Sequence, residues 1–159
     1  LIKKFYSNTR YNISFEPGRY LVAKAGILIT KILTSKTNGS INFLITDAGM
    51  QTFLRPAMYN AYHKIIALKK NENIKNYTVA GPICESSDVF AKNVNLPIQE
   101  TGNYLAICDT GAYGFVMSSN YNTKSLPAEI LIHNNMFAII RNKEIISSLI
   151  QKDVVPDWL

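Results

Sequence analysis

The sequence ILTSKTNGSINF (residues 32–43) sets Asn38-Gly39 between two segments rich in β-branched and apolar residues. Asn and Gly both tolerate positive φ, which the tight turns of β-hairpins require. The stretch therefore predicts a hairpin. A second tight hairpin is predicted at Asn134-Asn135, between the apolar segments 130–132 and 137–139.

Segments of β character recur at short intervals along the rest of the chain. Turn-forming residues separate them, as is typical of barrels and sandwiches built from many short strands. The expected strands are 26–33, 41–46, 65–68, 77–80, 104–108, 128–133 and 136–141. We expect a mainly β fold, a Greek-key-like β-barrel or sandwich with a few short helices.

The expected helices are short. They cover 56–62, a turn after a cap at Ser86 and Ser87, 113–119 and 143–150. The terminal residues 153–159 are expected to pack back through Trp158, because an exposed apolar tail is unusual.

Length and composition restrict the class of protein. The chain has 159 residues, 47% of them hydrophobic, which suits one domain with a real core. No apolar run reaches the roughly 20 residues that a membrane-spanning helix needs. The net charge of +6 could indicate nucleic acid, but the lysines are scattered, and basic and aromatic residues do not alternate along one predicted strand. We expect neither a membrane nor a nucleic-acid partner.

The cysteines indicate the cellular compartment. Cys84 and Cys108 are too few for a disulfide framework, and with His63 and His133 they lack the spacing of zinc ligands. This usage predicts a reducing cytoplasm and no metal site. Cys108 stands in an apolar segment, so we expect it in the core. Because the chain begins at Leu1 without a signal-peptide pattern, we also expect it to be part of a longer chain.

A thiol and a carboxylate stand side by side in GPICESSD (residues 81–88). Neighbours on a strand point to opposite faces, but Gly81-Pro82 favours an irregular loop in which Cys84 and Glu85 can share one site. The alternative is that Cys84 is a buried small hydrophobic residue, which is the usual fate of a free cysteine.

Three further motifs combine charged or aromatic residues with turn formers. The connection Glu16-Pro17-Gly18-Arg19 holds an acid and a guanidinium, and is either a ligand-binding loop or a solvated surface turn. Arg55 and Tyr59 share a face if their segment is helical, and can then grip a carboxylate; alternatively, Tyr59 packs in the core and Arg55 reaches outward. In GAYGF (residues 111–115), small residues either expose the Tyr113 hydroxyl or allow a turn around a packed ring.

The four motifs, in this order and approximate spacing, resemble those of the carboxy-terminal part of the meso-diaminopimelate decarboxylases. That family consists of fold-type III pyridoxal-phosphate enzymes, which convert meso-2,6-diaminopimelate to L-lysine and CO2. The similarity extends from about residue 13 to residue 159. It implies that residues 1–20 are the last strand and loop region of a barrel, and that residues 21–159 form a C-terminal β domain.

The resemblance implies that Glu16, Pro17, Gly18, Arg19 and Tyr113 bind pyridoxal 5'-phosphate. Glu16 would pair with the pyridine nitrogen and keep it protonated, so that the ring can accept electrons when CO2 leaves. Arg19 would lie between the cofactor phosphate and a substrate carboxylate. Tyr113 would hydrogen-bond the phosphate and approach the substrate.

The resemblance also assigns the remaining motif residues. Arg55, Tyr59 and Glu85 would hold the distal end of the substrate, whose ammonium and carboxylate need acid and base together. Cys84 would be catalytic and protonate the carbon that CO2 has left. In the family, the loop that carries Cys84 reaches into the active site of the neighbouring subunit, which implies a two-fold homodimer with shared sites.

One part of the family pattern has no counterpart here. The cofactor-binding lysine, the ring-stacking histidine and the glycine-rich phosphate loop belong to an amino-terminal (β/α)8 barrel, which no segment of this chain resembles. We therefore expect the chain alone to be inactive, and to act only with a barrel from a longer chain or a separate polypeptide.

Two alternatives stay open. An ornithine- or arginine-type decarboxylase domain is disfavoured, because such enzymes resemble Cys-Asp at the loop and lack the Arg-Pro-x-x-Tyr element. The other alternative is a non-catalytic remnant or β module that binds a partner.

Overall fold

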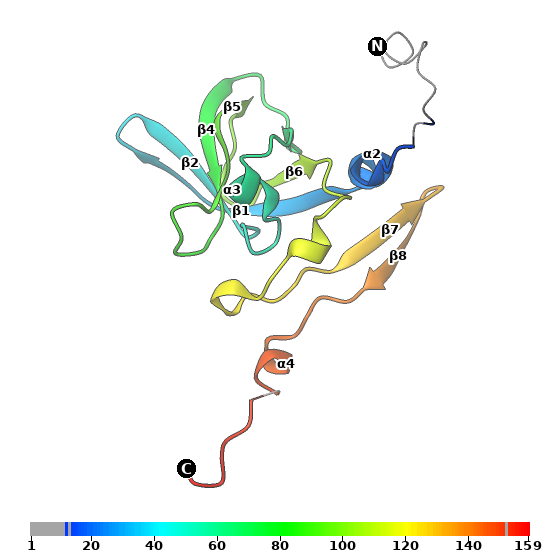
Figure 1. Ribbon diagram of the computed structural model, residues 1–159. Coiled ribbons are helices and arrows are strands. Elements are labelled where there is room, and N and C mark those ends of the chain that lie inside the picture. The colour runs from blue at the N-terminus through cyan, green and yellow to red at the C-terminus, as the bar shows by residue number, and fades with distance from the viewer. Residues whose placement is uncertain (1–11, 13, 152) are drawn as a thin grey trace.

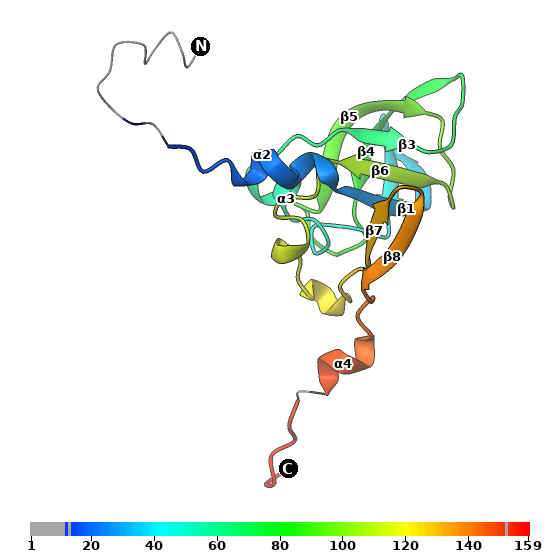
Figure 2. The same cartoon turned by 90° about the vertical axis from the view of Figure 1, so that its right-hand side faces the viewer.

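The computed structural model describes residues 12, 14–151 and 153–159. Its centre is a six-stranded sheet in the order β3-β6-β1-β2-β4-β5 (Figure 1). The edge strands β3 and β5 lie close to each other, so the sheet curls into a nearly closed barrel (Figure 2). The strands are β1 Ile27–Asn38, β2 Ile41–Thr46, β3 Ile65–Ala67, β4 Ile74–Ala80, β5 Val89–Pro97 and β6 Tyr104–Cys108. The expected mainly β, barrel-like fold is confirmed.

The hairpin between β1 and β2 is confirmed as well. Asn38 pairs with Ile41, and Gly39 has a φ of 57°. The two turn residues are therefore Gly39-Ser40, one position later than expected, and Asn38 is the last residue of its strand. Only Gly39 is in the left-handed region that two-residue hairpin turns require.

The parallel pairing of β2 with β4 requires a long crossover, and this crossover carries the helix α3 (Arg55–Tyr59). β2 and β4 are parallel, whereas the other neighbours in the sheet are antiparallel. Parallel neighbours need a crossover connection. Residues 47–73 provide it, and carry α3 and the strand β3 to the far edge of the sheet.

The core fills the inside of the curled sheet. Its buried side chains come from all six strands and from the crossover: Ile32, Leu44, Ala48, Phe53, Ile65, Tyr77, Val79, Phe90, Leu96, Leu105 and Ile107. Phe53 is 1% exposed and meets the ring of His63 edge to face, with the centroids 4.6 Å apart. This contact anchors the crossover immediately before α3.

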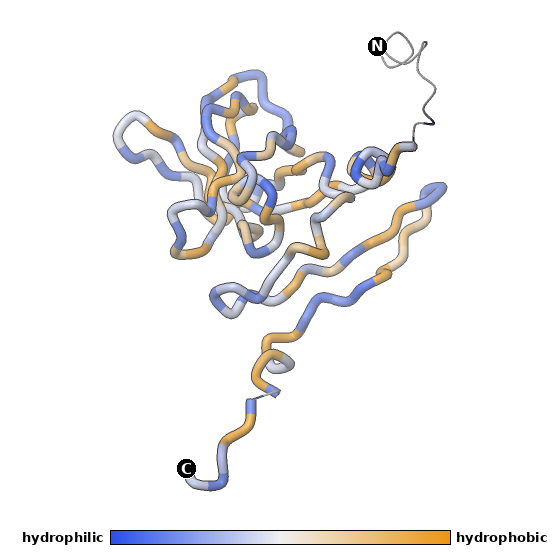
Figure 3. The backbone as a smooth tube through the Cα atoms, in the orientation of Figure 1, coloured by the Kyte–Doolittle hydropathy of each residue, from blue (hydrophilic) through white to orange (hydrophobic). Residues whose placement is uncertain are grey.

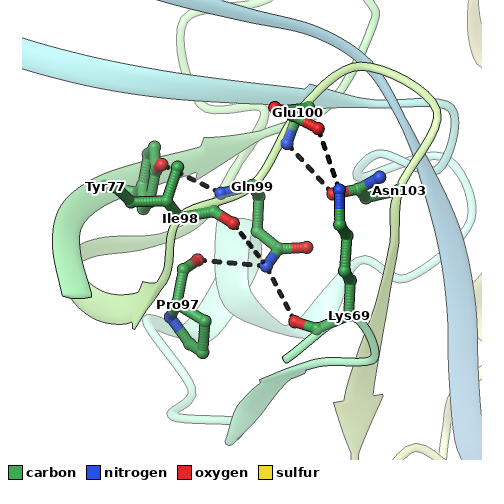
Figure 4. Close-up of polar contacts among 7 residues, drawn as sticks. All are labelled: Lys69, Tyr77, Pro97, Ile98, Gln99, Glu100 and Asn103. Atoms are coloured by element: carbon green, nitrogen blue, oxygen red, sulfur yellow. Dashed lines mark hydrogen bonds and ion pairs between the residues drawn. The ribbon is translucent and has the colours of Figure 1, made fainter. Parts of the chain in front are cut away.

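Gln99 ties the end of β5 to the loop between β3 and β4 (Figure 4). Its backbone N–H donates to the hydroxyl oxygen of Tyr77 over 3.2 Å. Its side-chain Nε2 lies within 3.1 Å of the carbonyl oxygens of Lys69, Pro97 and Ile98. The network therefore joins the loop after β5 to the loop between β3 and β4, next to Tyr77 on β4.

A second sheet has only two strands, β7 Glu129–His133 and β8 Met136–Arg141. The expected tight turn is confirmed, since Asn134 and Asn135 have φ values of 47° and 62°. Hydrophobic residues predominate along both strands of this hairpin (Figure 3). Its exposed large apolar side chains are Ile130, Leu131, Ile132, Met136, Phe137, Ile139 and Ile140. Both strands are edge strands, so the hairpin is an apolar ribbon that no third strand covers within the described part of the chain.

The helices are short, as expected. They are α2 Gly18–Val22, α3 Arg55–Tyr59, α4 Ile146–Ile150 and the 3-10 turns Ala23–Ala25, Phe115–Met117 and Tyr121–Thr123. The proposed boundary near residue 20 stays a prediction, and residues 1–11 and 13 lie outside the described residues.

Three local expectations are wrong. The segment after Ser86 and Ser87 is the strand β5 rather than a helix, and it was hidden because a bulge at Asn93, with a φ of 56°, interrupts its alternation. Trp158 is 83% exposed, so the C-terminal tail does not pack back through it. Cys108, at the end of β6, is half-buried rather than part of the core.

Candidate functional site

Arg55 is held between two tyrosine rings. Its guanidinium carbon lies 5.6 Å from the ring centroid of Tyr59 and 5.5 Å from that of Tyr113, within range of cation–π attraction. Arg55 begins α3, where Pro56 follows it in the first turn and sets the helical backbone angle. Tyr59 follows one turn later on the same face, as the spacing predicts.

The exposure of these residues rejects the alternative arrangement. Arg55 is only 9% exposed, whereas Tyr59 is 56% and Tyr113 46% exposed. The tyrosine is therefore not the core residue of the pair, and the arginine does not extend into solvent. The guanidinium has a fixed place, with two phenol groups at the surface beside it.

Tyr113 brings a second motif to the same place. A methyl group at Gly18 would lie 3.9 Å from the Tyr113 hydroxyl oxygen, so the first residue of α2 faces that hydroxyl. The loop is held there by backbone contact: Gly111 N–H donates to the Ala23 carbonyl over 3.0 Å, and a side chain at Gly111 would collide with the Val22 carbonyl. Small residues around Tyr113 therefore serve close packing.

Glu16 and Arg19 flank this contact at the surface. Both are exposed, on the turn into α2 and in its first turn. The donors near Gly18 are a guanidinium and a phenol, which are suited to an anionic group such as a phosphate. The residues present thus fit the phosphate end of pyridoxal phosphate, and Glu16 supplies a carboxylate on the same turn.

The Cys84–Glu85 loop is irregular, as expected, and Cys84 is exposed rather than buried. The Oε1 atom of Glu85 accepts hydrogen bonds from the Ser87 N–H over 3.2 Å and from the Ser87 hydroxyl over 2.9 Å. The Tyr121 hydroxyl donates to Oε2 over 3.4 Å. The bonds from Ser87, followed by smaller ones from Tyr121 and Ser86, hold the pKa of Glu85 below its ordinary value. Glu85 is therefore an anion at neutral pH.

Sequence reasoning missed two residues of this loop's surroundings. Tyr121 stands among Asn residues without a motif, and only the fold brings it to Glu85. Asp88 is part of the GPICESSD stretch, but its neighbours give no sign that it is 4% exposed and accepts the N–H groups of Met50 and Ile83. Burial raises the pKa of Asp88, although these two hydrogen bonds oppose the rise.

The site residues form two groups. Arg55, Tyr59, Tyr113 and Gly18 make the first, and Cys84 with Glu85 makes the second. A surface depression lies close in sequence to Tyr59 and Glu85, although none of the residues of the two groups lines it. It is lined by the end of α3 and the start of β5, with Ala57, Asn60, Ser87 and Phe90 among its residues.

Among the described residues, no three or more His, Cys, Asp and Glu side chains come together as a metal site. The same part of the chain has no helix long and apolar enough to span a membrane.

Comparisons with known proteins identify the family to which this fold belongs. The family model described as pyridoxal-dependent decarboxylase, C-terminal sheet domain, matches residues 19–111. A curated diaminopimelate decarboxylase of Archaeoglobus fulgidus is 45% identical over 146 residues, which are 91% of this chain and 35% of that protein. The chain thus spans about a third of the length of this relative.

Solved structures repeat the pattern. The crystal structure of the M. jannaschii diaminopimelate decarboxylase in complex with L-lysine matches with a TM-score of 0.89 and 41% identity, over 99% of this chain and 37% of that one. The lysine/ornithine decarboxylase from Vibrio vulnificus shares the fold, with a TM-score of 0.61 at 22% identity, over 65% of this chain and 28% of that one. Since the family model covers more than half of its residues, the chain belongs to the pyridoxal-dependent decarboxylases, and it carries the fold of their C-terminal sheet domain.

Proposed function

We propose that this chain supplies the C-terminal part of the active site of a diaminopimelate decarboxylase, and acts together with a barrel domain that binds pyridoxal phosphate. The observation that carries the proposal is the buried guanidinium of Arg55 between Tyr59 and Tyr113, in a fold that also presents the anionic Glu85 on a loop. In the homodimer of this proposal, Arg55 of one subunit and Glu85 of the other hold one ligand between them.

The substrate chemistry supports this pairing. Each end of diaminopimelate carries an ammonium and a carboxylate. Arg55 binds the carboxylate of the end that does not react through parallel hydrogen bonds, and the hydroxyl of Tyr59 adds another. Glu85 binds the ammonium of that end. A substrate with only an ammonium there would leave the Arg55 guanidinium without its anion.

The other residues act at the reacting end. Pyridoxal phosphate, when bound, supplies the electron sink that accepts the bonding pair released with CO2. In this proposal Glu16 pairs with the ring nitrogen of the cofactor, and Pro17, Gly18, Arg19 and Tyr113 bind its phosphate. The observation that supports the phosphate contacts is that Gly18 faces the Tyr113 hydroxyl.

Cys84 donates a proton. The bond between the reacting carbon and its carboxyl group breaks, CO2 leaves, and the Cys84 thiol supplies the proton that takes its place, so that one product is L-lysine. The role uses the neutral thiol. Its exposed position on the Cys84–Glu85 loop lets it reach a substrate held by another domain.

The assembly follows from this division. The barrel comes from the rest of a longer chain or from a separate polypeptide, and the Cys84–Glu85 loop completes the site of a neighbouring subunit in a homodimer in the cytoplasm. A site whose cofactor-binding lysine lies in the barrel does no chemistry alone.

An ornithine- or arginine-type decarboxylase is the weaker candidate. Its support is the shared fold of the Vibrio vulnificus protein at 22% identity, against 41–45% for the diaminopimelate decarboxylases named above. Arg55 also argues against it, because the distal end of ornithine has no carboxylate to occupy the guanidinium.

Reconstitution tests the proposal. The N-terminal part of the Archaeoglobus fulgidus protein, ending where its match to this chain begins, is fused or mixed with this chain and given pyridoxal phosphate. We expect L-lysine and CO2 from meso-diaminopimelate, and none from ornithine or arginine. Either half alone is the control and should be inactive. A correctly folded reconstituted protein that releases no lysine would show the proposal to be wrong.

A further inference from the structure

Asp88 connects the two groups of site residues through hydrogen bonds to their backbone neighbours. Its carboxylate oxygens each accept a hydrogen bond from a different loop: Oδ1 from the Met50 N–H over 2.6 Å, and Oδ2 from the Ile83 N–H over 3.0 Å. Its own carbonyl accepts the Gly81 N–H over 3.0 Å. One side chain, 4% exposed, is therefore bonded to both loops.

The seat of this carboxylate is made by two glycines. A methyl group at Gly49 would lie 2.7 and 2.8 Å from the Asp88 carboxylate oxygens, and one at Gly81 would lie 2.2 and 2.3 Å from them. The Gly81 methyl would also lie 2.4 Å from the Gly49 Cα, so the two loops touch through backbone atoms. Both positions therefore require the absence of a side chain, which the sequence alone gave no reason to expect.

Each bonded N–H stands next to site residues. Ile83 immediately precedes Cys84. Met50 begins a run of tight turns that leads directly into α3. In this run the Phe53 N–H donates to the Gly49 carbonyl, and the Met58 N–H donates to the Leu54 carbonyl. The position of Arg55 at the start of α3 is thereby coupled to Met50. The other bond between these loops is a weak contact of the Ser87 hydroxyl with the Met50 sulfur at 3.6 Å.

We propose, on the basis of the proposed function, that Asp88 is a positioning residue that fixes the Cys84–Glu85 loop against the segment carrying Arg55. In the proposed homodimer, Arg55 stays in the site of its own subunit, whereas the Cys84–Glu85 loop enters the site of the neighbouring subunit. The loop must therefore leave the segment that carries Arg55 in one fixed direction if Glu85 is to meet a ligand there. Asp88 does not touch the ligand. It acts through the backbone of Met50 and Ile83.

An amide cannot do the same work as this carboxylate. In Asp88→Asn, one oxygen becomes an NH2 group, which faces a backbone N–H and cannot accept from it. The shorter bond to Met50 is retained by the remaining oxygen, and Ile83 loses its acceptor. The variant therefore loosens the Cys84–Glu85 loop first.

Asp47→Asn is the matched control. Both hydrogen bonds to Asp47, from the Thr30 hydroxyl at 2.6 Å and the Lys31 N–H at 2.9 Å, end on the single oxygen Oδ1. An amide oxygen can keep both. The control thus makes the same change of charge and of atoms without removing an acceptor, at a place between β1 and the end of β2.

Backbone hydrogen exchange in this chain is the first measurement. In Asp88→Asn, we expect the amide of Ile83 to exchange at least about 10-fold faster, with the amide of Ile107 in β6 unchanged as evidence that the sheet is intact. In Asp47→Asn, the Ile83 amide should keep its rate. Equal exchange rates of the Ile83 amide in the wild type and in folded Asp88→Asn would show that Asp88 does not hold the Cys84–Glu85 loop.

A measurement on the wild type covers the case in which Asp88→Asn does not fold. The amide proton shifts of Met50 and Ile83 are followed by NMR with the carboxyl carbon of Asp88 as the pH is lowered. We expect all three to change with one midpoint. If the amide proton shifts of Met50 and Ile83 do not change with the titration of the Asp88 carboxyl group, Asp88 does not join the two loops.

Kinetics of the reconstituted enzyme then separate positioning from folding. For Asp88→Asn we expect KM for meso-diaminopimelate to rise about 10-fold, and for Asp47→Asn a change below about twofold. If the wild type is active and Asp88→Asn keeps the wild-type KM, the positioning role is wrong while the proposed function stands. If the wild type makes no lysine, the proposed function is wrong, and the amide measurements still decide whether Asp88 joins the two loops.

Discussion

The guanidinium of Arg55 and the ring of Tyr113 meet at 5.5 Å, which joins the start of α3 to the turn that follows β6. The contact places a delocalised cation over an aromatic ring. A lysine ammonium, which is compact and strongly hydrated, has neither the plane nor the forked donors for this place. The pair therefore makes arginine specifically necessary, rather than any positive charge.

Replacing Arg55 with Lys should weaken substrate binding in the reconstituted enzyme. We expect KM for meso-diaminopimelate to rise about 10- to 100-fold, because two parallel hydrogen bonds become one at most. Arg141→Lys is the control, since Arg141 lies on β8 and pairs with the exposed Glu129. Steady-state kinetics of both variants decide the matter. An unchanged KM in Arg55→Lys would contradict the assigned role.

Replacing Cys84 with Ser should slow the chemistry and leave binding nearly intact. The serine hydroxyl is a much weaker acid than a thiol, so kcat should fall by about 10²- to 10⁴-fold, the usual contribution of a positioned acid. Cys108→Ser, on the half-buried β6 position, is the control and should retain most of kcat. A Cys84→Ser enzyme as fast as the wild type would mean that another group donates the proton.

Glu85 gives a prediction of pH dependence. Its pKa is lowered in the folded chain, chiefly by the hydrogen bonds from Ser87, so the ionised form contributes stability above the unfolded value near 4.5, which is lost as the pH falls through the folded value. Ser87→Ala should move the pKa of Glu85 back upward. Ser86→Ala should move it less, because the Ser86 contact is the smallest of the causes.

A carbon-detected NMR titration of the Glu85 carboxyl group measures these shifts directly. The experiment needs only this chain and no cofactor. Equal pKa values in the wild type and Ser87→Ala would show that Ser87 does not stabilise the anion.

Asp88 titrates with the opposite sign. Burial raises its pKa above the ordinary 3.8, so the folded chain binds that proton more tightly than the unfolded chain, and this contribution to stability is lost as the pH rises through the folded value. Asp88→Asn removes the titration. The stability advantage of the wild type over this variant should therefore be larger at pH 3 than at pH 7, as urea unfolding at both pH values can show. An advantage that grows toward pH 7 would contradict the raised pKa.

Local sequence patterns account for much of the fold. The turn-forming Gly39 and the Asn134-Asn135 pair mark both hairpins, because only a few residue types adopt positive φ at low cost. The apolar segment that forms β6 is equally readable, since three consecutive buried residues leave no doubt about its environment. These features depend on residues that are neighbours in the chain.

The parts that were not predicted depend on distant contacts. β5 was missed because a bulge at Asn93 breaks its alternation, and the strand exists only through its pairing with β4. Tyr121 reaches Glu85, and Asp88 reaches Met50, across folded loops that no spacing rule describes. The sequence predicts the residues of the four motifs, but not the groups that hold them in place.

The apolar ribbon formed by β7 and β8 limits the concentration at which the free chain can stay monomeric. Two open edges and exposed side chains such as Ile132 and Phe137 offer a template on which further chains can add strand by strand. The rate of that addition rises with the concentration of free chain. Free chain at high concentration is therefore expected to self-associate through this ribbon, and dilution should reverse the early steps.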